Sequence, residues 1–241
     1  MSVQEVLLLA MTRMRSGICV AGMTREPDPV TGLRWVRPVR DFETVLPGDM
    51  SDETGCLFQC GQVVTLHLIE PRPAPPHAED WLADFVHHRP RCVRSLDADR
   101  RETFFAEHLD QAPYEVLLAQ KRSLCLVEPA RVWASFTLDV YSGKYEARMG
   151  FALSGAAGQL PALSSTGASV TDLKWRALGR EWLGEGGGLR LNQTELLARL
   201  NCSRLYLAVG LSRKWKDQYW PLVVGVHTVP DYAATVDAAN L

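Results

Sequence analysis

The chain has 241 residues, of which 46% are hydrophobic and 22% are charged, and its formal net charge is -2. This composition is typical of a globular chain with a sizeable core, and it excludes wholesale disorder and a uniformly basic nucleic-acid-wrapping protein. No apolar run approaches the roughly 20 residues of a membrane-spanning helix. The apolar stretch at 6–11 lacks a basic flank and a cleavage site, so we expect a cytoplasmic protein without a membrane partner.

Short runs rich in Val, Leu, Ile and aromatic residues, bounded by Gly, Pro or charges, predict β-strands. In chain order they are 6–11, 17–22, 33–39, 63–70, 124–136, 145–153, 204–211 and 220–229. Apolar periodicity predicts helices at 79–88, 97–109, 171–183 and 192–200. Asp97 caps the second of these helices, and Asn192 with Glu195 gives the fourth a capping-box start.

Two breaks divide the pattern. The proline-rich run at 71–76 reads as a stiff connector, and the Gly-, Ala- and Ser-rich run at 154–169 reads as a loop. We therefore predict a mostly-β, β-rich α+β protein of two small barrel-like lobes. Its expected parts are a first lobe at 1–76, a helical insert at 77–122 and a second lobe at 123–241, with N-terminal strands that pack with both lobes.

A short internal repeat favours two related lobes. Residues 7–13 and 206–213 each form an apolar strand that ends in a hydroxyl residue and an arginine. Each is followed by a polar turn and a second apolar run that contains glycine. Two such hairpins at opposite ends of the chain indicate a duplication.

A cationic strand surrounds a tryptophan in the stretch LRWVRPVRDF. In an extended strand Trp35 and Arg37 share one face, while Arg34 lies on the other. Pro38 confines this strand to an edge or a bulge. We expect Trp35 to stack on a nucleic-acid base and the arginines to bind phosphates. The alternative is that Trp35 belongs to the core and the arginines form a solvated edge.

A second cluster lies at a predicted hairpin tip, residues 212–220. Cations alternate there with aromatic rings, which is typical of single-stranded nucleic-acid binding, although a turn is polar in any case. Its binding candidates are Arg213, Lys214, Trp215, Lys216 and Tyr219. The matching turn near the N-terminus contributes Arg13 and Arg15.

Catalytic, cofactor and metal motifs are absent from the sequence. There is no nucleophile elbow, P-loop or dinucleotide fingerprint, so we assign no catalytic residue and no cofactor. An enzyme requires dispersed acids to assemble from distant segments, which leaves catalysis open but disfavoured. Cys56, Cys60, His87 and Cys92 lack the tight paired spacing of a structural zinc site, so we predict no metal.

Three stretches together resemble a bacterial family of dual OB-fold domains. They are SGICVAGM at 16–23, LRWVRPV at 33–39 and YLAVGLSR with YWPLVVGVHTVPDY between 206 and 232. The resemblance implies two packed five-stranded OB-like barrels, nucleic-acid binding and a setting in bacterial defence. It covers Gly17, Cys19, Gly22, Trp35, Arg37, Pro38, Gly210, Gly225, Pro230 and Asp231 as pattern positions and gives none of them a role.

Together these observations predict a non-catalytic protein that binds single-stranded or structured RNA or DNA. A protein-interaction module is the alternative, because Trp and Arg are also enriched where proteins dock. A hydrolase or nuclease with dispersed acids is the third hypothesis.

Overall fold

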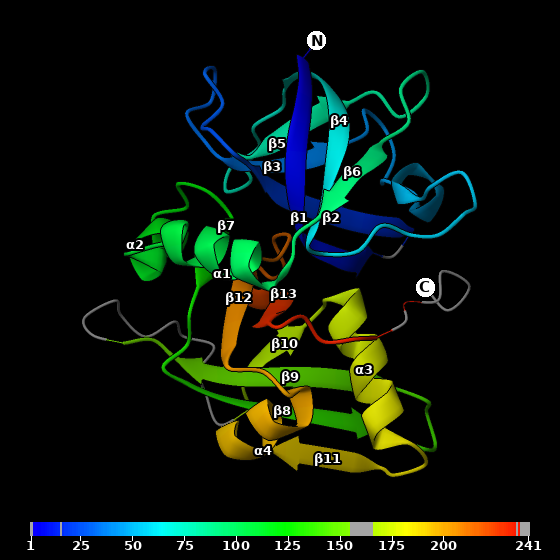
Figure 1. The fold of residues 1–241 in the computed structure, drawn as a ribbon, viewed down its shortest axis with the longest axis vertical. Coiled ribbons are helices and arrows are strands. Elements are labelled where there is room, and N and C mark those ends of the chain that lie inside the picture. The colour runs from blue at the N-terminus through cyan, green and yellow to red at the C-terminus, as the bar shows by residue number, and fades with distance from the viewer. Residues whose placement is uncertain (1, 15, 155–165, 235, 237–241) are drawn as a thin grey trace.

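The computed structural model describes residues 2–14, 16–154, 166–234 and 236. Its ribbon shows two β-rich lobes, one above the other along the long axis, with helices near their junction and on the lower lobe (Figure 1). The predicted mostly-β fold with helical segments is confirmed. Within the described ranges, no helix combines the length and the apolar character needed to cross a bilayer.

The first lobe is a closed barrel of five strands. They are β1 (Ser2–Met14), β2 (Gly17–Thr24), β3 (Trp35–Val39), β4 (Gln62–Pro71) and β5 (Asp80–Ala83). Hydrogen-bonded neighbours follow the order β1-β2-β3-β5-β4, and β4 pairs again with β1; only β3 and β5 are parallel among these pairs. A sixth strand, β6 (Arg91–Ser95), pairs with β4, and a short 3-10 helix, η1 (Pro47–Met50), precedes β4.

Strand β1 closes the barrel because it is long enough to have two partners. Its first half pairs with β4 and its second half with β2. Side chains of residues 2–5 alternate in exposure, whereas residues 6–12 are all buried. In that buried run Val6, Leu8 and Met11 face the barrel core, while Leu7 and Leu9 belong to a second cluster shared with the other lobe. The continuous apolar run therefore reports burial on both faces of one strand.

The second lobe consists of a seven-stranded sheet and two helices. Its elements are β7 (Leu124–Val127), β8 (Arg131–Leu138), β9 (Tyr145–Ala152), β10 (Ala168–Val170), α3 (Leu173–Leu183), β11 (Gly188–Leu191), α4 (Gln193–Leu200), β12 (Arg204–Leu211) and β13 (Pro221–Val229). The central strands follow the order β8-β9-β10-β13-β12, with β10 and β13 parallel. This is the strand order of the barrel, in which the third and fifth strands are also the parallel pair.

The shared strand order changes how the internal repeat is interpreted. The β1–β2 hairpin supplies the first and second strands of the barrel, whereas β12–β13 supplies the fourth and fifth strands of the second sheet. The two similar hairpins are therefore not in equivalent positions. The correspondence between the lobes lies in strand order, which short sequence matches do not report.

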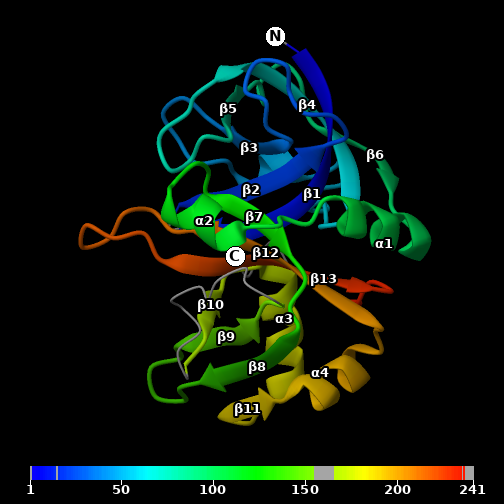
Figure 2. The same cartoon turned by 90° about the vertical axis from the view of Figure 1, so that its left-hand side faces the viewer.

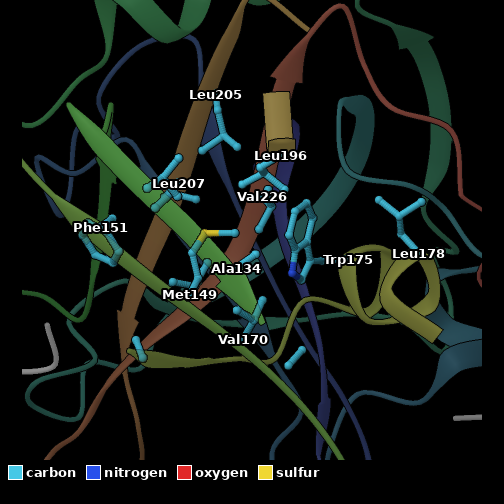
Figure 3. Close-up of a cluster of buried hydrophobic side chains, with 14 of the residues drawn as sticks. Ala134, Met149, Phe151, Val170, Trp175, Leu178, Leu196, Leu205, Leu207 and Val226 are labelled. Carbon is cyan, nitrogen blue, oxygen red and sulfur yellow. The ribbon is translucent and has the colours of Figure 1, made fainter. Parts of the chain in front are cut away.

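The core of the second lobe forms where α3 packs on the sheet (Figure 3). Trp175 of α3 is fully buried and lies 5.6 Å from Phe136 of β8, centroid to centroid. Gly179, which weakens the helix in sequence terms, has a packing reason: an added Cβ would lie 2.1 Å from the Phe136 ring. Asp172 caps α3 by accepting a hydrogen bond from the Trp175 N–H at 3.1 Å.

The two lobes meet across β1 and β13, with α1 (Ala98–Glu107) and α2 (Pro113–Leu118) in the connecting segment (Figure 2). Buried Phe105 of α1 lies 4.8 Å from the Tyr206 ring, centroid to centroid. His227 Nε2 lies 2.9 Å from the Leu9 carbonyl oxygen. Position 225 is glycine because an added Cβ would lie only 1.9 Å from that same oxygen.

The helix predicted at 79–88 is wrong. Residues 80–83 form β5, and residues 91–95 form β6, so both segments join the first sheet rather than a helical insert. Trp81, Ala83 and Phe85 are buried at every second position, which is the period of a strand. The other three helices are confirmed as α1, α3 and α4, with caps at Asp97, Asp172 and Asn192.

Candidate nucleic-acid interface

A cavity of about 820 Å³ opens on the first lobe, where the β2–β3 face meets the turn after β1 and the loop after β4. Its lining includes Met14 and Ser16 beside the β1–β2 turn, Cys19 of β2, Arg37 of β3, Arg72 of the β4–β5 loop and, from the second lobe, Arg213. Four arginines line it in all, against the three acids Asp41, Glu43 and Asp80. The cavity is therefore lined by both charged and apolar side chains, with one more arginine than acids.

Arg37 forms part of the cavity wall. It lies directly across the parallel β3–β5 pair from Asp80, and its Nη2 donates to Asp80 Oδ2 at 2.8 Å while Nε donates to Oδ1. Burial raises the pKa of Asp80, although the Arg37 guanidinium opposes that rise. Burial likewise raises the pKa of the Cys19 thiol beside Arg37. Arg37 is committed to this bidentate pair, so its main role is to position the wall.

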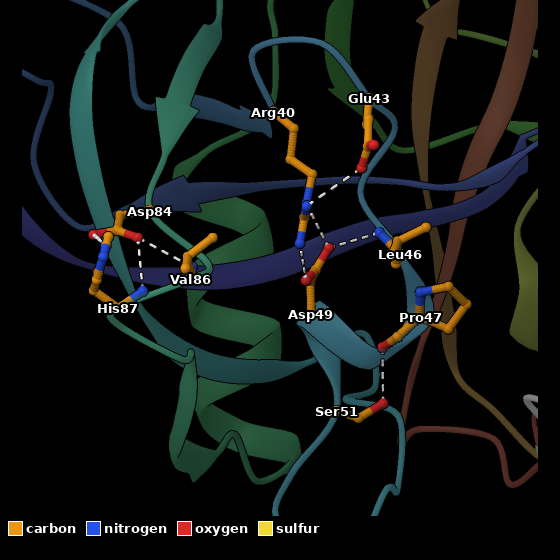
Figure 4. A network of polar contacts seen from close by, with 9 residues as sticks. All are labelled: Arg40, Glu43, Leu46, Pro47, Asp49, Ser51, Asp84, Val86 and His87. Carbon is orange, nitrogen blue, oxygen red and sulfur yellow. Dashed lines mark hydrogen bonds and ion pairs between the residues drawn. The ribbon is translucent and has the colours of Figure 1, made fainter.

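Arg40 is held in the same way, as Figure 4 shows. Its Nε lies 2.9 Å from Asp49 Oδ2, and its Nη1 lies 3.6 Å from Glu43. The hydrogen bonds that Arg40 donates to Asp49 raise the pKa of Arg40. Asp49 also accepts the Leu46 N–H at 2.7 Å, so the segment between β3 and η1 is fixed to the cavity rim.

The remaining two arginines differ in how they are paired. Arg72 Nη2 lies 2.7 Å from Glu70 and 3.5 Å from Asp41, and the side chain is half exposed. Arg213 is exposed and makes no ion pair with any residue that the structure describes. It is thus the cation of the cavity that is available to an incoming anion.

The hairpin tip, residues 212–220, carries the other predicted cations into solvent (Figure 2). Trp215 is 58% exposed, and Lys216 Nζ lies 4.4 Å from its ring centroid. Lys214 Nζ lies 3.1 Å from Asp217, a pair that is exposed and therefore weak. Tyr219 anchors the tip, because its hydroxyl donates to the Pro75 carbonyl oxygen at 3.4 Å. The β12–β13 loop of one lobe thus contacts the β4–β5 loop of the other.

The prediction that Trp35 stacks on a base is wrong. The side chain is 3% exposed and belongs to the cluster between the lobes, together with Phe105. Its strand pairs Trp35 with Met23 of β2, so the indole faces the second lobe instead of solvent. The alternative stated for this residue, a core tryptophan, is the correct one.

Phe42 is the exposed aromatic residue of that stretch. It lines the cavity and is 94% exposed. Its sequence signal is modest: a single aromatic residue after Pro38, where the strand ends and a polar loop begins. Arg40 and Arg72 were also missed as lining residues, because only the folded chain brings the loop after β4 next to the one after β3.

Arg34 and Arg13, two further predicted residues, lie apart from the cavity lining. Arg34 precedes β3 and its Nη2 lies 3.7 Å from Glu26. Arg13 is exposed at the end of β1. Arg15 lies outside the described residues. Of the predicted residues, the structure therefore brings Arg37 and Arg213 into one cavity, with the hairpin tip adjoining it.

Among the residues that the structure describes, no group of three or more His, Cys, Asp or Glu side chains is placed to hold a metal ion. His67 and His88 stack at 4.1 Å, centroid to centroid, and Asp84 contacts the His88 Nδ1 at 2.9 Å. Asp84 also accepts the backbone N–H of His87 at 2.9 Å. Its hydrogen bonds with His87 and His88 lower the pKa of Asp84. They account for this cluster as an internal network on the first lobe.

Comparison with known families gives one finding. A family model described as a dual OB-containing domain matches residues 4–226. No curated protein and no solved structure matches the chain significantly.

Proposed function

Because the chain belongs to the family of dual OB-containing domains, a fold that commonly binds nucleic acids, we propose that it binds single-stranded or structured nucleic acid without a catalytic step of its own. OB folds bind oligonucleotides on the face of their second and third strands and on the loops after their first and fourth strands. The cavity occupies this region of the first barrel. That coincidence carries the proposal.

The residues divide into three roles. Arg213, Lys214 and Lys216 supply the cations that contact phosphates, since each is exposed. Phe42 and Trp215 offer ring faces on which bases stack. Arg37 and Arg40, each held by an aspartate, shape the wall, and Tyr219 positions the hairpin tip.

A salt titration of oligonucleotide binding tests this function directly. Fluorescence anisotropy with labelled single strands of DNA and RNA should show affinity falling as salt rises. About four phosphate contacts to a single strand give a log–log slope of roughly -3. Absence of binding at about 50 mM salt, where such contacts are strong, would remove the function proposed here.

Phe42 provides a test of base stacking that does not depend on charge. Phe42→Leu keeps an apolar side chain but removes the ring, and should weaken binding of a pyrimidine oligonucleotide about tenfold, since stacking on one base contributes about 1–3 kcal/mol. Phe42→Trp keeps a ring and should bind like the parent protein. Because Phe42 is almost fully exposed, neither substitution should alter the unfolding midpoint. Equal affinities of the two variants would show that Phe42 makes no stacking contact.

A protein-interaction role has one specific observation in its favour. A second, shallower cavity of about 530 Å³ beside Phe42 is lined by the exposed apolar side chains of Ile69 and Val86. Exposed apolar residues that gather in one place are typical of docking surfaces.

The cytoplasmic location and the bacterial defence setting stay predictions.

A further inference from the structure

Three arginines gather where the lobes meet, outside the cavity; we call Arg13, Arg176 and Arg180 the arginine cluster. Arg176 and Arg180 lie one turn apart on α3, and their guanidinium carbons lie 4.8 and 4.3 Å from the centroid of one ring, Tyr145. Arg13 lies near the end of β1, next to Thr12, which forms a β-bridge with Asp172, the cap of α3. Residues from both lobes therefore contribute to the cluster.

Within the described part of the chain, the cluster has no counter-ion. None of its three members makes an ion pair with a described residue. Arg176 is half-buried, and its guanidinium donates to the carbonyl oxygens of Val170 and Tyr145, both at 3.4 Å. Burial lowers the pKa of Arg176, and the charges of Arg180 and Arg13 add to that effect.

The acid whose charge acts on Arg176 already has other partners. Glu146, which acts on Arg176 through its charge, lies 2.6 Å from Lys144 and 3.2 Å from Arg148. The Glu146 carboxylate is therefore shared between Lys144 and Arg148 and does not pair with Arg176. Like charges held together without compensation cost free energy, and a bound anion removes that cost.

The cluster and the cavity lie on either side of one turn. Met14 and Ser16, which line the cavity, follow Arg13 in the chain. Arg13, whose charge acts on Arg176, is therefore the member of the cluster that adjoins the cavity lining in the chain. Guanidinium groups suit this ligand because they donate two parallel hydrogen bonds to a phosphate.

We propose that Arg13, Arg176 and Arg180 bind backbone phosphates of the nucleic-acid strand that occupies the cavity, so that one continuous strand contacts both lobes. This inference rests on the proposed function. It adds a second phosphate site, formed by the end of β1 and by α3, and a footprint longer than the first barrel alone supplies.

A length series tests the site. One OB fold covers about 4–16 nucleotides, so labelled oligothymidylates from about 4 to about 24 nucleotides should first fill the cavity and then reach the cluster. The test variant is Arg176→Gln with Arg180→Gln. The matched control is Arg190→Gln with Arg199→Gln. These arginines are exposed and also lie over aromatic rings, Arg190 over Trp133 and Arg199 over Trp182. They belong to β11 and α4, which are far from the first lobe (Figure 1).

The expected result is specific for long strands. The test variant should bind the shortest oligonucleotides like the parent, bind the longest about tenfold more weakly, and lose about 1.4 from the log–log salt slope, or about 0.7 for each lost contact. The control variant should match the parent at every length. Arg13→Gln, on the first lobe, should also weaken binding of the longest oligonucleotides. Because this substitution leaves α3 unchanged, it distinguishes the loss of phosphate contacts from a disturbance of that helix.

Each outcome is decisive. Parent-like binding of long strands by both the Arg176/Arg180 and the Arg13 variants overturns the second phosphate site, while the proposed function stands on the short strands. Weaker binding at all lengths, with an unchanged unfolding midpoint, also overturns it, because the cluster then acts within the cavity. Failure of the parent to bind any strand removes the proposed function and this inference with it.

Discussion

Replacing Arg213, Lys214 and Lys216 together with glutamine is expected to abolish oligonucleotide binding at physiological salt. Arg213 is the cavity arginine that has no ion-pair partner among the described residues, and the two lysines extend its charge along the hairpin tip. Losing three phosphate contacts to a single strand should also reduce the log–log salt slope by about 2. The measurement is the same anisotropy titration, made at several salt concentrations.

The matched control replaces three other cations of the second lobe, Arg131, Arg190 and Arg199, with glutamine. These arginines are exposed and form no ion pair with described residues. Because three cations are replaced in each variant, the change in net charge is identical. Binding close to that of the parent is expected. If both triple variants lose affinity equally, only the total charge matters and the hairpin tip has no special role.

The same pair of variants separates the two candidate functions. A protein partner anchored by apolar side chains such as Phe42 and Val86 depends little on the cations of the tip. A nucleic acid depends on them strongly. A complex that survives the tip substitutions therefore favours docking of a protein.

The substitution Gly225→Ala is expected to give the largest loss of stability. The added methyl group would lie 1.9 Å from the Leu9 carbonyl oxygen, so β1 and β13 must move apart and the His227 hydrogen bond to that oxygen lengthens. Overpacking of this kind costs about 3 kcal/mol of unfolding free energy. For a chain of this size that corresponds to a fall of about 6–12 °C in the unfolding midpoint.

Gly48→Ala is the control for this prediction. Position 48 lies in η1, and an added Cβ there meets nothing within 4 Å. Its unfolding free energy should stay within about 0.5 kcal/mol of the parent value. Similar losses in the two variants, measured by thermal and denaturant unfolding, would show that the junction of the lobes tolerates the extra methyl group.

Local signals in the sequence predicted what depends on neighbours along the chain. The caps of α1 and α4 and the apolar strands at both ends are of this kind. The exposed cations of the hairpin tip follow from a polar turn between two apolar runs. Strand β6 was missed because its residues are all exposed and include two arginines and a serine, and only pairing with β4 makes them a strand.

Trp35 and Phe42 show where local reasoning fails. Alternation along β3 separates two faces, but it does not say which face a second lobe will cover. The tryptophan faces that lobe, and the phenylalanine beyond the strand remains in solvent. Burial by a distant part of the chain is a tertiary effect, and the short motif around these residues does not encode it.

The double burial of β1 has a consequence for synthesis of the chain. All five barrel strands are complete once residue 83 has left the ribosome, but Leu7 and Leu9 are covered by residues of β12 and β13. During elongation the nascent barrel therefore exposes a row of apolar side chains that its own strands do not cover. Arg213 belongs to the same late segment. The cavity of the first lobe therefore gains Arg213 at nearly the same time as the exposed apolar side chains of β1 become covered.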